Sequence, residues 1–174
     1  MKLLILFATI EGQTRKIADH LAQAAEEMGH TVVMHDADTD DVGLALGGVD
    51  RVVLAASVHR RRHPQSFEKL VQSQADALKG LPTLLYSVSL CAAFDEGLKE
   101  AQTYVDEMCD RTGFVPSETV LVGGALQFDK YQDYEAWIVR YIALGLRNYD
   151  KAEGDREFTD WDALTQSLSA YVSS

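Results

Sequence analysis

The segment from residue 2 to residue 28 constrains the fold of this chain more than any other. An apolar run over residues 2–8 leads into a short loop with hydroxyl side chains at Thr9 and Thr14 and a glycine at position 12. A helical pattern begins directly after the loop, with apolar residues repeating on one face. A strand that delivers such a loop to a helix N-terminus is typical of an anion site, because backbone N–H groups and the helix dipole face the anion.

The spacing of this loop excludes two common nucleotide-binding motifs. It lacks the Gly-Lys-Ser/Thr ending of the nucleoside-triphosphate loop and the three glycines of the dinucleotide fingerprint. A turn glycine followed by a threonine cap is the plain alternative to an anion site.

Four more apolar runs alternate with helical patterns along the chain. The expected strands are residues 2–8, 31–35, 51–57, 83–90 and 119–123. The expected helices are about residues 13–28, 64–79, 94–112, 131–147 and 161–172. This alternation predicts an α/β fold with a parallel sheet covered by helices on both faces, and the length fits one domain over residues 1–174.

Composition narrows the class of protein. The net charge of -11 disfavours non-specific binding to nucleic acid or to anionic lipid. No apolar run approaches the ~20 residues of a membrane-spanning helix, and we expect no signal peptide. The two cysteines lack C-x-x-C spacing, which predicts reduced thiols in the cytoplasm, and the five histidines form no H-E-x-x-H motif, so no metal site is expected.

Five sequence blocks carry a family resemblance over nearly the whole chain. They are T-I-E-G-Q-T at 9–14, A-S-V-H-R-R-R-H at 56–63, Y-S-V-S-L at 86–90, G-A-L-Q-F at 124–128 followed by Tyr131, and F-T-D-W at 158–161. In this order they resemble the flavodoxin-like quinone-dependent protoporphyrinogen IX dehydrogenases, bacterial enzymes of haem synthesis. The resemblance implies a flavodoxin-like doubly wound sheet of five strands in the order 2-1-3-4-5. In that order a ligand lies between strands one and three, at their carboxyl ends.

The resemblance also implies FMN as the cofactor. The spacing T-x-x-G-x-T is similar to the FMN-phosphate loop of flavodoxin-like proteins, which assigns Thr9 and Thr14 to the phosphate. We expect Glu11 to face solvent or to cap a helix N–H. The implied cofactor-binding residues are Thr9, Ile10, Glu11, Gly12, Gln13, Thr14, Ser57, Val58, His59, Arg60, Arg61, Ser87, Val88, Ser89 and Leu90.

Three consecutive arginines stand out in an acidic chain. Arg60, Arg61, Arg62 and His63 are candidate substrate-binding residues, because guanidinium groups suit carboxylates such as porphyrin propionates. The alternative is that these arginines pair with surface acids. The family commonly has glycine where this chain has Arg61, and glycine adopts a left-handed turn at lower cost. His59 is a candidate acid or base near neutral pH, with a structural histidine as the equal alternative.

Two helical patterns near the C-terminus have apolar faces. The stripe of Tyr131, Tyr134, Trp137 and Tyr141 predicts core packing or, alternatively, a slot for a flat ring. The closing helix is expected to begin after a cap at Thr159 or Asp160.

The function implied by the resemblance is oxidation of protoporphyrinogen IX to protoporphyrin IX, with FMN passing electrons to a quinone. Two alternatives stay open: a flavodoxin-like electron carrier, and an NAD(P)H:quinone reductase without porphyrin activity. The implied location is the cytoplasm, with at most weak peripheral contact at the inner face of the cell membrane, and a homo-oligomer is compatible with the sequence.

Overall fold

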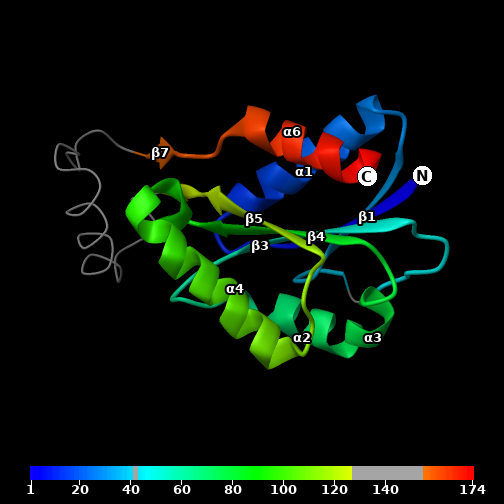
Figure 1. Cartoon of the computed structure of the whole chain (residues 1–174), viewed down its shortest axis with the longest axis horizontal. Coiled ribbons are helices and arrows are strands. Elements are labelled where there is room, and N and C mark those ends of the chain that lie inside the picture. Colours follow the sequence, from blue (N-terminus) through cyan, green and yellow to red (C-terminus); the bar gives the residue numbers. More distant parts are fainter. Residues whose placement is uncertain (41–42, 127–154) are drawn as a thin grey trace.

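The computed structural model describes residues 1–40, 43–126 and 155–174 (Figure 1). Its central sheet is parallel, with the strand order β2-β1-β3-β4-β5. The strands are β1 Lys2–Ala8, β2 Thr31–Asp36, β3 Arg51–Ser57, β4 Thr83–Ser89 and β5 Glu118–Gly123. The predicted fold class and strand order are confirmed, and each strand lies within one residue of its predicted bounds.

Helices cover both faces of the sheet (Figure 1). On one face lie α1 Gln13–Glu27 and α6 Trp161–Ser173, and on the other lie α2 Gln65–Ser73, α3 Ala75–Leu78 and α4 Leu98–Thr112. Alternate side chains of β1 enter the two cores, since side chains of a strand point to opposite faces in turn. Leu3, Ile5 and Phe7 pack with α1 and α6, whereas Leu4 and Leu6 pack with α2 and α4.

Two predicted helices are divided in the structure. The expected helix over 64–79 is α2 and α3, separated at Gln74. The helix expected from residue 94 is preceded by two 3-10 turns, Cys91–Ala93 and Asp95–Gly97, and α4 begins only at Leu98. These turns bring Gly97 against the Cys91 carbonyl, where a Cβ atom would collide. The late start of α4 therefore has a packing cause that helical periodicity does not reveal.

The segment before α6 crosses the end of β5. Residues Ala125–Leu126 (β6) pair antiparallel with Arg156–Glu157 (β7), and the Thr159 hydroxyl donates to the Gly123 carbonyl at 2.8 Å. Asp160 caps α6 by accepting from the Ala163 N–H at 2.9 Å. Of the two predicted caps, Thr159 and Asp160, the structure therefore uses Asp160. The expected helix over 131–147, with its aromatic stripe, lies outside the described residues.

No helix within the described residues has the length and apolar character needed to cross a membrane.

Candidate functional site

A pocket opens at the carboxyl ends of β1, β3 and β4, where the strand order reverses. Two loops form most of its wall: the threonine loop, residues 9–14 after β1, and the arginine loop, residues 57–63 after β3. Residues from the end of β4 and the position after it, from α4 and from the segment directly after β5 complete it. The lining residues are Thr9, Ile10, Glu11, Gln13, Thr14, Ser57, Val58, His59, Arg60, Arg61, Val88, Ser89, Leu90, Tyr104, Gly124 and Ala125.

The threonine loop turns through a glycine and opens onto a helix N-terminus. Gly12 has a φ of 96°, and its N–H donates to the Thr9 hydroxyl oxygen at 2.9 Å. The helix α1 then begins at Gln13 with no side-chain cap. Because the first N–H groups of a helix have no partner within the helix, they can bind an anion at this end.

Three buried polar atoms beside this helix end have no hydrogen-bond partner within the described part of the chain. They are Thr14 Oγ1, Gln13 Oε1 and Ser57 Oγ. A buried polar group without a partner is unfavourable, so a ligand with matching groups would stabilise the site. FMN fits this set: its phosphate accepts from hydroxyl and backbone donors, and the hydroxyls of its ribityl chain suit the Gln13 oxygen.

Gln13 also ties the threonine loop to the segment before α6. Its amide nitrogen donates to Glu157 Oε2 at 2.9 Å and to Thr159 Oγ1 at 3.0 Å. Since Thr159 in turn holds the end of β5, these bonds join three sides of the pocket. The F-T-D-W block thereby acquires a structural role that its sequence does not reveal.

The arginine loop forms a two-residue hairpin turn. The backbones of His59 and Arg62 exchange two hydrogen bonds, with N···O distances of 2.9 and 3.1 Å. Between them Arg60 has a φ of 48° and Arg61 a φ of 65°. Hairpin turns of this kind require left-handed residues and favour glycine or asparagine. The chain thus adopts the left-handed turn that the family glycine suggests, but with two arginines.

Arg61 contacts α4 across the pocket wall. Its Nη1 lies 2.8 Å from Glu100 Oε1, and its guanidinium lies over the Tyr104 ring at 5.4 Å from the centroid. The Tyr104 hydroxyl donates to the same Glu100 oxygen at 2.8 Å and contacts Cys91 Sγ at 3.4 Å. Burial, followed by the hydrogen bonds to Cys91 and Glu100, raises the pKa of Tyr104, so its hydroxyl remains a donor.

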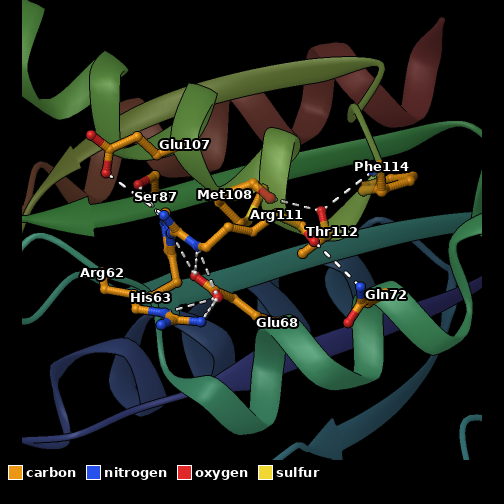
Figure 2. Close-up of polar contacts among 10 residues, drawn as sticks. All are labelled: Arg62, His63, Glu68, Gln72, Ser87, Glu107, Met108, Arg111, Thr112 and Phe114. Carbon is orange, nitrogen blue, oxygen red and sulfur yellow. Dashed lines mark hydrogen bonds and ion pairs between the residues drawn. The ribbon is translucent and has the colours of Figure 1, made fainter.

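The structure does not bring Arg62, His63 or Ser87 to the pocket wall. Arg62 donates two hydrogen bonds to Glu68 Oε2, at 3.0 and 2.7 Å, and the same carboxylate pairs with Arg111 (Figure 2). His63 is 1% exposed and shares a hydrogen bond of 3.0 Å with Ser87 Oγ. These side chains have partners within the protein, and substrate contact for Arg62 and His63 and cofactor contact for Ser87 stay predictions.

Glu11 and His59 face each other inside the pocket. His59 Nδ1 lies 3.7 Å from Glu11 Oε1, and both residues line the wall. The Glu11 side chain is 20% exposed, so it lies partly in the pocket and partly in solvent. Burial lowers the pKa of His59; Glu11 raises it in part, and Arg60 lowers it further. The lowered pKa favours the neutral form of the His59 imidazole.

Sequence reasoning missed Tyr104, Gly124 and Ala125 as lining residues. Gly124 and Ala125 belong to a block that the resemblance singled out without a role. Tyr104 repeats with the apolar face of α4, so periodicity gives it a core role and carries no sign of the pocket.

The comparisons with known proteins agree with this geometry. A family model described as a flavodoxin domain matches residues 4–152. The protoporphyrinogen IX dehydrogenase (quinone) of Escherichia coli strain K12 is 29% identical over 169 residues, covering 94% of this chain and 91% of that protein. The resemblance inferred from the five blocks is thus confirmed.

Solved structures of flavodoxins share the fold. A short-chain flavodoxin associated with a bacterial microcompartment aligns with a TM-score of 0.60 at 15% identity, covering 99% of this chain and 97% of that chain. Flavodoxin 2 from Bacillus cereus aligns with a TM-score of 0.56 at 16% identity, covering 99% of each. The predicted flavodoxin-like architecture is confirmed by these matches.

Proposed function

Because the chain belongs to the flavodoxin domain family, we propose that it oxidises protoporphyrinogen IX to protoporphyrin IX and passes the electrons to a quinone. The cofactor is FMN, which supplies the redox chemistry when bound. The proposal treats residues 1–174 as one catalytic domain. Its substrate and acceptor are those in the name of the Escherichia coli relative.

The observation that carries the proposal is the set of buried, unpartnered polar atoms of Gln13, Thr14 and Ser57. All three residues line the pocket, and Gln13 and Thr14 begin a helix without a side-chain cap, at the point where a doubly wound sheet binds its ligand. We assign the Thr14 and Thr9 hydroxyls and the first N–H groups of α1 to the FMN phosphate. The arginine loop and the loop after β4 are assigned to the flavin ring.

Arg60 is the proposed contact for a substrate carboxylate. It lines the pocket and its side chain is exposed. In a chain with a net charge of -11, a cation at the mouth of the pocket attracts a substrate that bears two propionates. We expect Arg60→Ala to raise the apparent substrate constant about ten-fold, as for loss of one charge-assisted hydrogen bond, while Arg60→Lys keeps part of the effect.

An electron carrier is the second candidate, favoured by the net charge of -11, since carriers dock redox partners through complementary charge. A stable blue neutral semiquinone on reductive titration would favour the carrier. Direct reduction by NADPH would instead favour a quinone reductase.

The deciding experiment is an anaerobic assay of the FMN-loaded protein. Porphyrin fluorescence is expected only when enzyme, protoporphyrinogen IX and a quinone are all present. A yellow protein that produces no porphyrin with any quinone would overturn the substrate assignment. A colourless protein that takes up no FMN at micromolar concentration would overturn the cofactor as well.

A further inference from the structure

We propose that Glu68 is a positioning residue for the flavin pocket. It holds Arg62, and through Arg62 it keeps the turn at Arg60 and Arg61 in its place in the pocket wall. The inference rests on the proposed function only in placing the flavin ring beside the arginine loop. No contact between Glu68 and the cofactor is implied.

The turn needs support because its backbone is unfavourable for arginine. Arg60 and Arg61 are the two residues other than glycine with positive φ in the described part of the chain, and they are consecutive. Left-handed backbone is costly for residues with a Cβ, and such conformations persist when the surroundings hold them. Both residues line the pocket, so the strained part of the loop is also the part that faces a ligand.

The Glu68 carboxylate is held in place by contacts other than those with Arg62. The residue is 4% exposed and lies in the first turn of α2, where the helix dipole favours an anion. Arg111, from the last turn of α4, contacts both of its oxygens, with Nη2 2.7 Å from Oε1 and Nε 3.1 Å from Oε2. Buried residues of α2 and α4 pack in one core, so this carboxylate lies between two helices that are packed together.

Arg62 docks on this carboxylate from the arginine loop. Its Nε and Nη2 both reach Oε2, at 3.0 and 2.7 Å, so the guanidinium is held in one orientation (Figure 2). Two hydrogen bonds to a charged acceptor fix position as well as charge. Since Arg62 directly follows the turn and its backbone closes the hairpin with His59, a fixed Arg62 also fixes the turn.

The other contact of the turn is weaker. The Arg61 and Arg62 side chains are about equally exposed, at 52% and 51%, but Glu100 is 25% exposed and makes one contact with Arg61, whereas Glu68 is 5% exposed and accepts two hydrogen bonds from Arg62. Ion pairs between exposed groups contribute little to holding a conformation. Glu68 is therefore the principal anchor and Glu100 the secondary one.

Glu68 has no direct role in proton transfer at the pocket. Burial alone would raise its pKa, but the hydrogen bonds and charges of Arg111 and Arg62 lower the pKa below its ordinary value. The group therefore stays a carboxylate near neutral pH, as an anchor for two arginines requires.

Two matched variants separate a positioning role from a role in helix packing. Arg62→Met removes the arginine that belongs to the loop, and Arg111→Met removes the arginine that belongs to α4, while each leaves Glu68 with one partner. The dissociation constants of FMN and of riboflavin are measured by quenching of flavin fluorescence, together with the visible spectrum of the bound flavin. Riboflavin lacks the phosphate, so its affinity reports on the contacts of the ring and the ribityl chain.

We expect Arg62→Met to raise the dissociation constants of FMN and riboflavin by the same factor, about ten-fold, and to shift the flavin spectrum. Arg111→Met should raise both constants by less than Arg62→Met does, because Glu68 loses part of its support but still holds Arg62. Glu107→Gln, which removes the other carboxylate near Arg111, at 3.7 Å, should leave both constants within about two-fold of the parent. Arg62→Lys keeps the charge without the two-pronged contact. It is expected to bind riboflavin with intermediate affinity, and it serves as the test variant if Arg62→Met does not fold.

Equal flavin affinity in Arg62→Met and the parent would overturn the inference, and so would equal losses in Arg62→Met and Arg111→Met. In both cases the parent still binds FMN and the proposed function stands. A parent that binds neither FMN nor riboflavin would overturn the proposed function and the inference together.

Discussion

The threonine loop and the arginine loop lie at the same edge of the sheet and reach left-handed backbone by opposite means. The first turns at Gly12, with a φ of 96°, and the second at Arg60 and Arg61, with φ values of 48° and 65°. Glycine needs no support in this conformation, whereas arginine does. The threonine loop can therefore leave its side chains for a ligand, while the arginine loop uses its side chains to hold itself.

The hydrogen bonds of the two loops follow this division. Thr14 and Gln13 keep buried atoms without a partner in the part of the chain that the structure describes, as do Ser57 and His63 at the two ends of the arginine loop. Arg61 and Arg62 instead have carboxylate partners at 2.8 and 2.7 Å. The threonine loop thus keeps polar atoms for a ligand, whereas Arg61 and Arg62 hold the turn of the arginine loop. Substitutions at these positions should affect binding and stability separately.

Loss of the Glu68 carboxylate should have the largest effect on stability. Glu68→Gln leaves Arg62 and Arg111 without their shared counter-charge. We expect the free energy of unfolding of the apoprotein to fall by about 3 kcal/mol, toward the lower end for breaking a buried ion pair, because both arginines reach solvent. Urea unfolding measures this loss.

Glu107→Gln is the control, since Glu107 lies 3.7 Å from Arg111 and its side chain is 43% exposed. Its effect should stay below ~1 kcal/mol. Equal losses of unfolding free energy in Glu68→Gln and Glu107→Gln would contradict the conclusion that the arginine loop is held by its side chains.

Acid should destabilise the arginine loop through His63. Burial lowers the pKa of His63 to about 4, with Glu68 raising it in part and Arg111 lowering it. The unfolded chain binds a proton near pH 6.5, so stability is lost as the pH falls from 6.5 to 4 and is constant below that for this group. A difference of about 2.5 pKa units corresponds to about 3 kcal/mol.

Unfolding at pH 7, 5.5 and 4 tests this expectation in the parent and in His63→Gln. The variant also keeps an amide that can contact Ser87, which is the partner of the parent histidine. The carboxylates contribute equally to both proteins, so the difference between the two curves reports on His63. Parallel curves would show that the buried histidine does not govern acid stability.

Removal of the Thr14 hydroxyl should separate binding from stability in the threonine loop. We expect Thr14→Val to weaken FMN by about 1.5–3 kcal/mol, as for a hydrogen bond to a charged group. The apoprotein should be as stable as the parent or more so, because Thr14 Oγ1 is buried without a partner among the described residues. Riboflavin, which has no phosphate, should bind the variant and the parent equally.

Thr9→Val is the matched variant, because the Thr9 oxygen accepts from the Gly12 N–H at 2.9 Å. It should lower both FMN affinity and apoprotein stability. An apoprotein destabilised by more than ~1 kcal/mol in Thr14→Val would mean that this hydroxyl supports the fold and is not reserved for a ligand.

The sequence predicts the framework of the molecule well because its signals are local. Apolar runs and turn residues set the five strands, and the alternation with helices sets a parallel sheet. The loop after β1 is likewise visible, since Thr9, Gly12 and Thr14 are close in sequence. The division of α2 from α3 and the late start of α4 are not visible, because the latter depends on a close approach between Gly97 and Cys91.

The roles within the arginine loop could not be predicted for the same reason. Three consecutive arginines look alike in sequence, and their partners Glu100 and Glu68 come from two different helices. Only the left-handed turn decides that Arg61 reaches α4 and Arg62 reaches α2. Side chains of β4 face the two sides of the sheet in turn, which places Ser87 on one side. Its contact with His63 also depends on where the arginine loop lies, and the sequence does not show that.

The smallest expected effect compares the two turns directly through paired substitutions. Arg61→Gly relieves a left-handed backbone worth about 1–2 kcal/mol and loses an exposed ion pair worth about 0.2–1 kcal/mol. We expect a net gain in apoprotein stability of about 0.5–1 kcal/mol from these two contributions.

Gly12→Ala should have the opposite sign and lower the stability of the apoprotein by about 1–2 kcal/mol. The loss is due to the backbone alone, since a Cβ at Gly12 would meet no atom within 4 Å. Urea midpoints at equal m-values measure both changes. If Arg61→Gly instead lowers stability, the contacts of Arg61 with Glu100 and Tyr104 outweigh its backbone strain, and Glu100 becomes an anchor of the turn equal to Glu68.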